Sequence, residues 1–146
     1  MPLFCSKNSD VETFLREKAI TFEKASRART YLILDEEALI DGKINIIAYF
    51  TVSNKALNPR DEISKNVRKH LDGLGNKRGS TFVVYLIGQL GKNDTYRSKI
   101  DGNELVARAI ATIKEAYEIV GGRCILIECQ NRVRLLFFVM LSTSQE

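Results

Sequence analysis

The sequence of 146 residues lacks the features that mark membrane, secreted and multidomain proteins. No apolar run approaches the roughly 20 residues that a helix needs to cross a bilayer. Residues 1–7 have neither the apolar core nor the cleavage site of a secretion signal. Internal repeats, linkers and low-complexity stretches are also missing. We therefore expect one cytoplasmic domain, which is large enough to bury about two-thirds of the surface of its unfolded chain.

Cysteine and histidine are scarce, with three and one residues. Cys124 and Cys129 are an odd number of positions apart on one expected strand, so their side chains leave opposite faces and cannot form a disulfide. Cys5 is far away in sequence, and an odd number of thiols is no disulfide framework. With His70 as the single histidine, no Cys/His spacing matches a zinc site, and we expect no metal.

Positive charge is in modest excess, at +4 overall. The excess is concentrated in residues 55–78, where basic residues outnumber acidic ones. Such a patch attracts nucleic acid or phosphate groups, and it is equally typical of a solvated helix face. The basic residues are Lys55, Arg60, Lys65, Arg68, Lys69, Lys77 and Arg78, against Asp61, Glu62 and Asp72.

Hydrophobic periodicity predicts one α/β domain with the order α-β-β-α-β-α-β-α. A capping box, with Ser9 as N-cap and Glu12 reaching back, begins the first helix. Gly121-Gly122 ends the longest helix. The expected elements are a helix at 9–24, strands at 29–34 and 44–52 joined by an acidic turn with room for one helical turn, a helix at 60–71, a central strand at 80–90, a helix at 102–120, a strand at 124–129 and a short helix at 131–138.

The most informative unit is a strand, a basic turn and a helix between residues 86 and 105. The apolar strand runs into Tyr96 and Arg97, and Gly102 then begins the longest helix. The first N–H groups of a helix have no intrahelical partner, and the helix dipole adds partial positive charge there. The unit is therefore suited to bind a phosphate or pyrophosphate, which predicts a nucleotide-type cofactor.

With this unit and element order, the sequence resembles the GNAT superfamily of acetyl-CoA-dependent N-acetyltransferases over most of its length. Ile87-Gly88-Gln89-Leu90-Gly91 looks like the central strand of that family, and residues 97–102 align with its pyrophosphate loop, Arg/Gln-x-x-Gly-x-Gly/Ala. Arg97 and Gly102 match, whereas Ile100 stands where glycine is usual. A β-branched residue does not easily adopt a positive φ or allow close approach to a phosphate, so we expect weaker pyrophosphate binding.

The resemblance implies an α+β fold with a mixed, mostly antiparallel central sheet flanked by helices, and acetyl-CoA as the cofactor. Backbone groups of the central strand would position the thioester, while the turn and the helix start would hold the pyrophosphate. The cofactor-binding residues implied in this way are Leu90, Gly91, Lys92, Arg97, Ser98, Lys99, Gly102, Asn103 and Asn131.

Further matches resemble the acetyltransferases of bacterial toxin–antitoxin modules. They comprise Phe14-Leu15 through Ala25-Ser26, then Ala28-Arg29-Thr30-Tyr31, and Ile47-Ala48-Tyr49-Phe50-Thr51-Val52. In that subgroup the acceptor is the amino group of aminoacyl-tRNA, and an antitoxin protein is the partner. RNA binding requires a basic face, since phosphates supply most of the affinity. The candidates are Arg27, Arg29, Lys55, Arg68, Lys69 and Lys77.

The C-terminus departs from the family pattern. The family has a tyrosine after the phenylalanine of its last helix, and that tyrosine protonates the CoA thiolate; here Val139 follows Phe138. Eight residues remain after Phe138, so we expect the final strand of the family to be missing and the C-terminus to be shortened. A missing strand would expose a sheet edge, and a homodimer would bury that edge or the last helix.

Glu128 is the candidate general base, because it is the charged residue in an otherwise apolar strand. A carboxylate there serves equally as a structural hydrogen-bond acceptor. Tyr96 and Tyr85 are candidates for the missing acid, although Tyr85 also fits a core position and Tyr96 also fits packing of the turn. His70, among Arg and Lys on an expected surface helix, fits a solvated role.

Three functions are consistent with the sequence. The first is an active amine acetyltransferase, which the central strand, Arg97 and Gly102 favour. The second is a GNAT remnant that binds CoA or a partner without turnover, which Val139 and the short C-terminus favour. The third is a nucleic-acid-binding module without enzyme activity, which rests on the basic segment.

Overall fold

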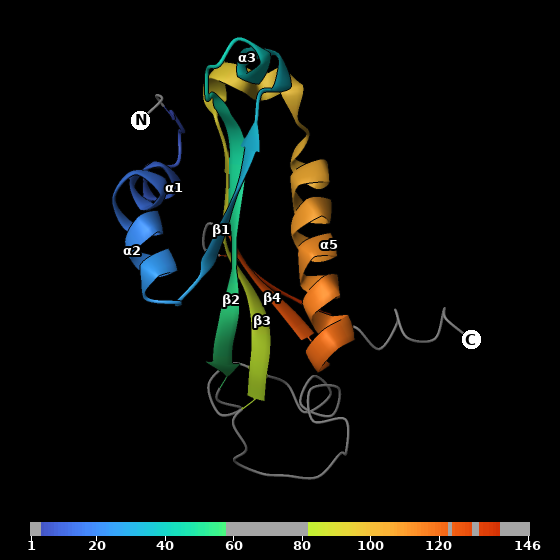
Figure 1. Cartoon of the computed structure of the whole chain (residues 1–146). Helices are drawn as coiled ribbons and strands as arrows, with labels where there is room; N and C mark the ends of the chain where they lie inside the picture. The colour runs from blue at the N-terminus through green and yellow to red at the C-terminus, as the bar shows by residue number, and fades with distance from the viewer. Residues whose placement is uncertain (1–3, 58–81, 123, 130–131, 138–146) are drawn as a thin grey trace, which may run out of the picture.

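The computed structural model describes residues 4–57, 82–122, 124–129 and 132–137, and it arranges them as helices on both faces of a five-stranded sheet (Figure 1). No helix in these ranges is both long and apolar enough to cross a bilayer. In chain order the elements are α1 (Ser9–Thr13), the π-helical turn η1 (Phe14–Lys18), α2 (Ala19–Lys24), β1 (Arg29–Leu34), α3 (Glu36–Ile40), β2 (Ile46–Leu57), β3 (Phe82–Lys92), the 3-10 helix η2 (Asp94–Lys99), α5 (Gly102–Val120), β4 (Cys124–Cys129) and β5 (Arg132–Phe137).

The sheet is mixed and mostly antiparallel, as the resemblance implied. Its strand order is β1-β2-β3-β4-β5, and each neighbouring pair is antiparallel except β3 and β4. A parallel pair requires a crossover connection, and α5 provides it on one face of the sheet (Figure 1). The expected central position of β3 is confirmed, because β3 is the middle strand.

Two hydrophobic clusters hold the layers together. The larger one joins α5 to the sheet, and Ile87, Ala109 and Ile113 in it are fully buried. The smaller one joins α1, η1 and α2 to the opposite face around Tyr49. The Tyr49 hydroxyl donates to the Val11 carbonyl at 2.5 Å, which satisfies a polar group that has no contact with water. Burial raises the pKa of this phenol.

The first helix begins one residue earlier than the capping box predicted. The N-cap is Asn8 instead of Ser9, since the Asn8 side chain accepts a hydrogen bond from the Asp10 N–H at 3.0 Å. Glu12 does reach back, but its carboxylate accepts from the Ser6 N–H, two residues before the cap. The predicted end of this helical segment at residue 24 is confirmed, with η1 as a π-helical interruption.

The longest helix has the predicted bounds. Asp101 caps α5 by accepting from the Asn103 N–H, and Gly102 is its first residue. Gly121 ends it with φ at +76°, a backbone conformation that favours glycine. The α5 carbonyl of Tyr117 accepts from the Gly121 N–H at 2.8 Å, so the helix ends in a satisfied turn.

One predicted element is wrong. Residues 132–137 form the strand β5, antiparallel to β4 over six residue pairs, where a short helix was expected at 131–138. The pairing satisfies the backbone groups of the outer edge of β4, which a helix would have left exposed. The helix expected at 60–71 lies outside the described residues, as do Val139 and the segment after it.

Candidate functional site

The central strand changes its neighbours at Gly88. In the ladder with β2, Val52 pairs with Ile87 and Thr51 pairs with Gln89, so Gly88 is the extra residue of a β-bulge. The parallel ladder between β3 and β4 covers Tyr85 to Ile87 and stops at the same point. Bulges bend a strand and increase its twist. Bending at Gly88 therefore separates the end of β3 from β4.

As a result, the edge of β3 that faces β4 carries no ladder over residues 88–92 among the described parts of the chain. Backbone N–H and C=O groups on such an edge are available to an extended ligand. Leu90, Gly91 and Lys92 lie on this segment, while their other edge pairs with Phe50, Tyr49 and Ala48 of β2. Over these residues, one edge of β3 is thus paired with β2, and the other edge can accept an extended ligand.

Asn93 fixes the turn that follows the strand. It is 1% exposed, its side-chain amide donates to the Ile46 carbonyl at 2.9 Å and its N–H donates to the Ile47 carbonyl at 2.7 Å. Its side-chain oxygen accepts from the Thr95 N–H and caps η2. Sequence reasoning missed this residue, because polar residues in turns are usually exposed.

Ile100 takes part in the core instead of lining a phosphate loop. Its side chain is 4% exposed and belongs to the cluster beneath α5. Its backbone is extended, with φ at −147° and ψ at 135°. The glycine of the family is therefore replaced by a residue that anchors the turn to the sheet.

Lys99 forms an ion pair with the cap of α3. Its amine lies 3.3 Å from one Asp35 oxygen and 3.8 Å from a Glu37 oxygen. Asp35 is buried and also caps α3 by accepting from the Glu37 N–H. The amine is thus shared between two carboxylates, and α3 and η2 lie together at one end of the sheet (Figure 1).

The start of α5 lies at the same end of the sheet (Figure 1). A Cβ added to Gly102 would meet no atom within 4 Å, so space adjoins the first turn of the helix. The Asp101 carboxylate accepts from the Asn103 N–H at 3.3 Å and thus occupies one of the free helix donors. An incoming phosphate would have to compete with this carboxylate for that donor.

Glu128 lies on β4 at the position directly after the last ladder pair, Ile87 with Ile127. Its carboxylate forms an ion pair with the Lys55 amine of β2, and both side chains are more than a third exposed. Glu128 alternates with Ile127, so it faces away from the α5 cluster. Tyr96 packs against that cluster from η2. The Tyr85 hydroxyl donates to the Gly121 carbonyl, which supports the core interpretation of Tyr85.

No protein-family profile and no curated protein sequence matches the chain. Solved structures do match it. A structure described as AtaT complexed with acetyl-methionyl-tRNAfMet is 16% identical, with a TM-score of 0.71 over 97% of this chain and 88% of that one. AtaTR bound with AcCoA is 13% identical, with a TM-score of 0.73 over 98% and 89%. A tyrosine-to-phenylalanine variant of KacT is 18% identical, with a TM-score of 0.71 over 97% and 88%.

The chain has the GNAT fold of the toxins AtaT and KacT. This match confirms the structural resemblance inferred from the sequence, at identities that establish the fold alone. Within this GNAT fold, the cofactor residues predicted from sequence fall into two groups: Leu90 to Lys92 on the strand edge, and those from η2 to the first turn of α5. The second group comprises Arg97, Ser98, Lys99, Gly102 and Asn103. Asn131 lies outside the described residues.

Gly91 has a packing role within the GNAT fold that the sequence did not reveal. A Cβ at this position would lie 2.3 Å from a Val11 methyl and 2.7 Å from the Tyr49 ring. The glycine therefore lets α1 approach β3 closely. Its side-chain position faces α1, whereas Leu90, which packs against the α5 cluster, faces the other side of the sheet.

Proposed function

We propose that the chain is an N-acetyltransferase that moves an acetyl group from acetyl-CoA to a primary amine, with the amino group of aminoacyl-tRNA as the acceptor. The observation that carries the proposal is the unladdered edge of β3 at residues 88–92, created by the bulge at Gly88. The same fold has been solved in AtaTR bound with AcCoA and in AtaT with acetyl-methionyl-tRNAfMet. An antitoxin is the corresponding protein partner, as in the AtaT structure that contains the C-terminus of AtaR.

The residues present fit acetyl-CoA along the strand and at the helix start. Main-chain groups of Leu90 and Lys92 would bind the extended pantetheine arm in the manner of an added strand. The first turn of α5, with space beside Gly102, would accept the pyrophosphate, assisted by Arg97, Ser98 and Asn103. Lys99 would contribute only by exchanging its pair with Asp35 for one with phosphate.

The cofactor supplies a thioester whose carbonyl carbon an amine can attack. As the new C–N bond forms and the C–S bond breaks, the amine loses a proton and the thiolate gains one. We propose Glu128, at the divergence of β3 and β4, as the proton acceptor and Tyr96 as the proton donor. Lys55 holds the Glu128 carboxylate through their ion pair and is thus a positioning residue.

Calorimetric titration with acetyl-CoA tests the cofactor site. Arg97→Ala and Gly102→Glu should each abolish measurable binding, since one removes a cation and the other puts a carboxylate beside the helix donors. Gly102→Ala is the matched control for the added Cβ, and Arg108→Ala, on α5, controls for the loss of an arginine outside the proposed site. Both controls should bind like the wild type. Wild-type protein that binds no acetyl-CoA would refute the proposal.

Turnover is measured separately, by the release of free thiol from acetyl-CoA in the presence of aminoacyl-tRNA. Glu128→Gln should lower kcat about 100-fold, typical of losing a general base, with acetyl-CoA affinity unchanged. The matched control is Glu118→Gln, on α5 outside the site. Equal rates for Glu128→Gln and Glu118→Gln would exclude Glu128 as the base.

A second candidate is a GNAT remnant that binds CoA or a protein partner without turnover. The ion pair of Lys99 with Asp35 and the buried Ile100 favour it, because both tie the expected phosphate turn into the core. In that case no thiol is released with any aminoacyl-tRNA, whether or not the titration shows acetyl-CoA binding. The homodimer expected from sequence stays a prediction. Light scattering of the purified chain tests it.

A further inference from the structure

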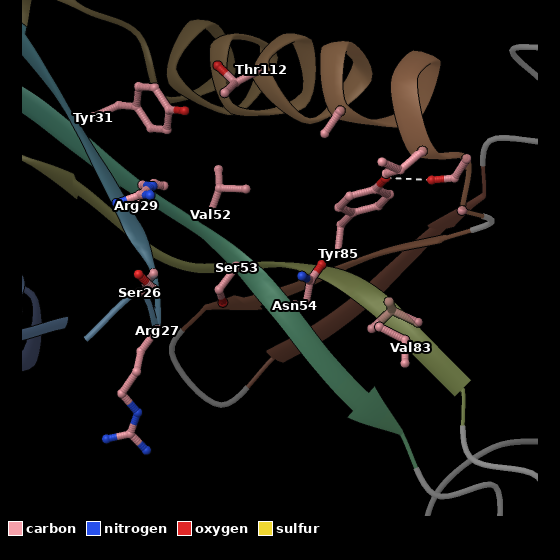
Figure 2. A pocket seen from close by; sticks show the side chains of 16 residues that line it. Ser26, Arg27, Arg29, Tyr31, Val52, Ser53, Asn54, Val83, Tyr85 and Thr112 are labelled. Carbon is pink, nitrogen blue, oxygen red and sulfur yellow. Dashed lines mark hydrogen bonds between the residues drawn. The ribbon is translucent and has the colours of Figure 1, made fainter. Parts of the chain in front are cut away.

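A hollow of about 710 Å³ lies between the sheet and the C-terminal half of α5 (Figure 2), and its lining includes none of residues 88–92 of the proposed cofactor edge. Its floor comes from β1, β2 and the first part of β3. Its wall comes from Thr112, Ala116 and Val120, which are four residues apart and so share one helix face. Sites for drug-sized ligands commonly have volumes of about 300–1,000 Å³. The hollow is therefore large enough for a small organic molecule.

The lining has a consistent chemistry. Among its sixteen residues are two arginines, several hydroxyl and amide groups and no carboxylate. Val52 and Tyr85 supply apolar surface. Such a lining suits a ligand with an apolar body, hydrogen-bonding edges and a negative charge.

Tyr31 gives the hollow a flat aromatic surface. Its ring stacks on Phe50 with a centroid distance of 5.1 Å and an interplanar angle of 15°, which fixes its orientation. The residue is nevertheless 42% exposed, and Figure 2 shows its ring at the end of the hollow near Thr112. An exposed aromatic face held in this way is a surface on which a planar base stacks.

Arg29 lies two residues before Tyr31 on β1, so both side chains lie on the same face, roughly 7 Å apart along the strand. One guanidinium nitrogen of Arg29 contacts Glu23 at 2.7 Å. A guanidinium has five N–H donors, so this contact orients Arg29 and leaves donors for a second anion. Glu23 offsets part of the charge. Arg27 lies at the rim, but its guanidinium lies over the Phe22 ring of α2 and points away from the hollow (Figure 2).

We infer that this hollow is a nucleotide-binding site in which the base stacks on Tyr31 and the phosphate pairs with Arg29. Asn54 and Thr112 are the lining groups that can hydrogen-bond the base edge or the ribose. The spacing of Tyr31 and Arg29 suits the separation of a base from its own 5′-phosphate. The nucleotide is either free or part of a single RNA strand, since both present the same chemistry. The site is separate from the proposed acetyl-CoA edge and does not depend on it.

The test is titration of the full chain with AMP, adenosine and a pentaadenylate, observed by calorimetry. Tyr31→Ala should weaken AMP binding about tenfold, whereas Tyr31→Phe should keep it, because the stacking surface is retained. Leu32→Ala is the matched control: Leu32 is 46% exposed on the same strand and faces the other side. Arg29→Ala should weaken AMP about tenfold and leave adenosine unchanged, since adenosine has no phosphate.

The outcomes separate this inference from the proposed function. AMP binding that depends on Tyr31 and persists in Gly102→Glu supports the nucleotide site, whether or not acetyl-CoA binds. AMP binding that is lost in Gly102→Glu but kept in Tyr31→Ala would assign AMP to the cofactor edge and overturn the inference. The absence of AMP binding to the wild type at millimolar concentration would also overturn it. Pentaadenylate that binds at least tenfold more tightly than AMP identifies an RNA strand as the ligand, and equal affinity identifies a free nucleotide.

Discussion

Replacing Gly91 by alanine should destabilise the folded chain, whether or not a cofactor is present. The added Cβ would lie 2.3 Å from the Val11 methyl and 2.7 Å from the Tyr49 ring, and both neighbours are buried. Tyr49 cannot move away easily, because its hydroxyl is hydrogen-bonded to the Val11 carbonyl. The backbone of α1 or β3 must therefore shift.

The expected cost is that of overpacking a well-filled core, about 1–3 kcal/mol. For a chain of this size the melting temperature should fall by roughly 3–10 °C. Thermal unfolding followed by circular dichroism measures it. Gly102→Ala is the matched control: its Cβ meets no atom within 4 Å, and alanine in a helix should leave stability equal or slightly higher. A melting temperature for Gly91→Ala within 1 °C of that of Gly102→Ala would refute the packing argument.

Three further substitutions have defined outcomes. Tyr49→Phe should lower the free energy of unfolding by about 1–2 kcal/mol at pH 7, measured by urea unfolding, because the hydrogen bond to the Val11 carbonyl is lost. Burial raises the Tyr49 pKa above its ordinary value of 10.0, so the extra stability of the wild type over Tyr49→Phe should shrink as the pH rises past 10. A stability difference that grows above pH 10 would contradict this. Gly121→Ala should cost about 1–3 kcal/mol in the same assay, because φ of +76° with ψ of −163° is a conformation that essentially only glycine adopts, and Gly121→Asn should cost about as much; a clearly smaller cost for asparagine would contradict this. Asp35→Ala should cost about 1–2 kcal/mol through loss of the α3 cap, whereas Lys99→Met should cost under about 1 kcal/mol because the Lys99 side chain is 40% exposed; a larger cost for Lys99→Met than for Asp35→Ala would contradict this.

Elements with a clear local signal could be predicted from the sequence. The strand at residues 29–34, the strand at 124–129 and the helix from Gly102 to Val120 have the predicted bounds, since their patterns and stop residues are unambiguous. The cap of the first helix was misplaced because Asn8, Ser9 and Asp10 are all good capping residues, and only geometry selects one.

The strand at residues 132–137 was missed for a different reason. Val133, Leu135 and Phe137 alternate in sequence as in a strand, but the family resemblance suggested a helix. What decides between them is the free edge of β4, and no local pattern reports on that edge. The ion-pair partners of Lys99 and Glu128 could not be predicted either, because Asp35 and Lys55 are 64 and 73 residues away from them in the sequence.

The candidate site was predicted in outline and not in detail. Its location at the end of β3 and the start of α5 follows from the strand–turn–helix pattern, and the structure has both elements there. The bulge at Gly88 and the burial of Ile100 and Asn93 could not be predicted, since they depend on how β2 and α5 pack on the strand.

The short parallel ladder has a consequence for the dynamics of the molecule. Among the described residues, three pairs join the β4–β5 hairpin to β3, whereas the hairpin itself is paired over six. The hairpin should therefore open as a cooperative unit, and its amides should exchange with solvent well before those of β2 and β3. A ligand bound between β3 and β4 would contact both strands and so stabilise this short parallel pairing. Slower hydrogen exchange in the hairpin would then report occupancy of the edge, even though the hairpin lies beyond the strand that the ligand touches.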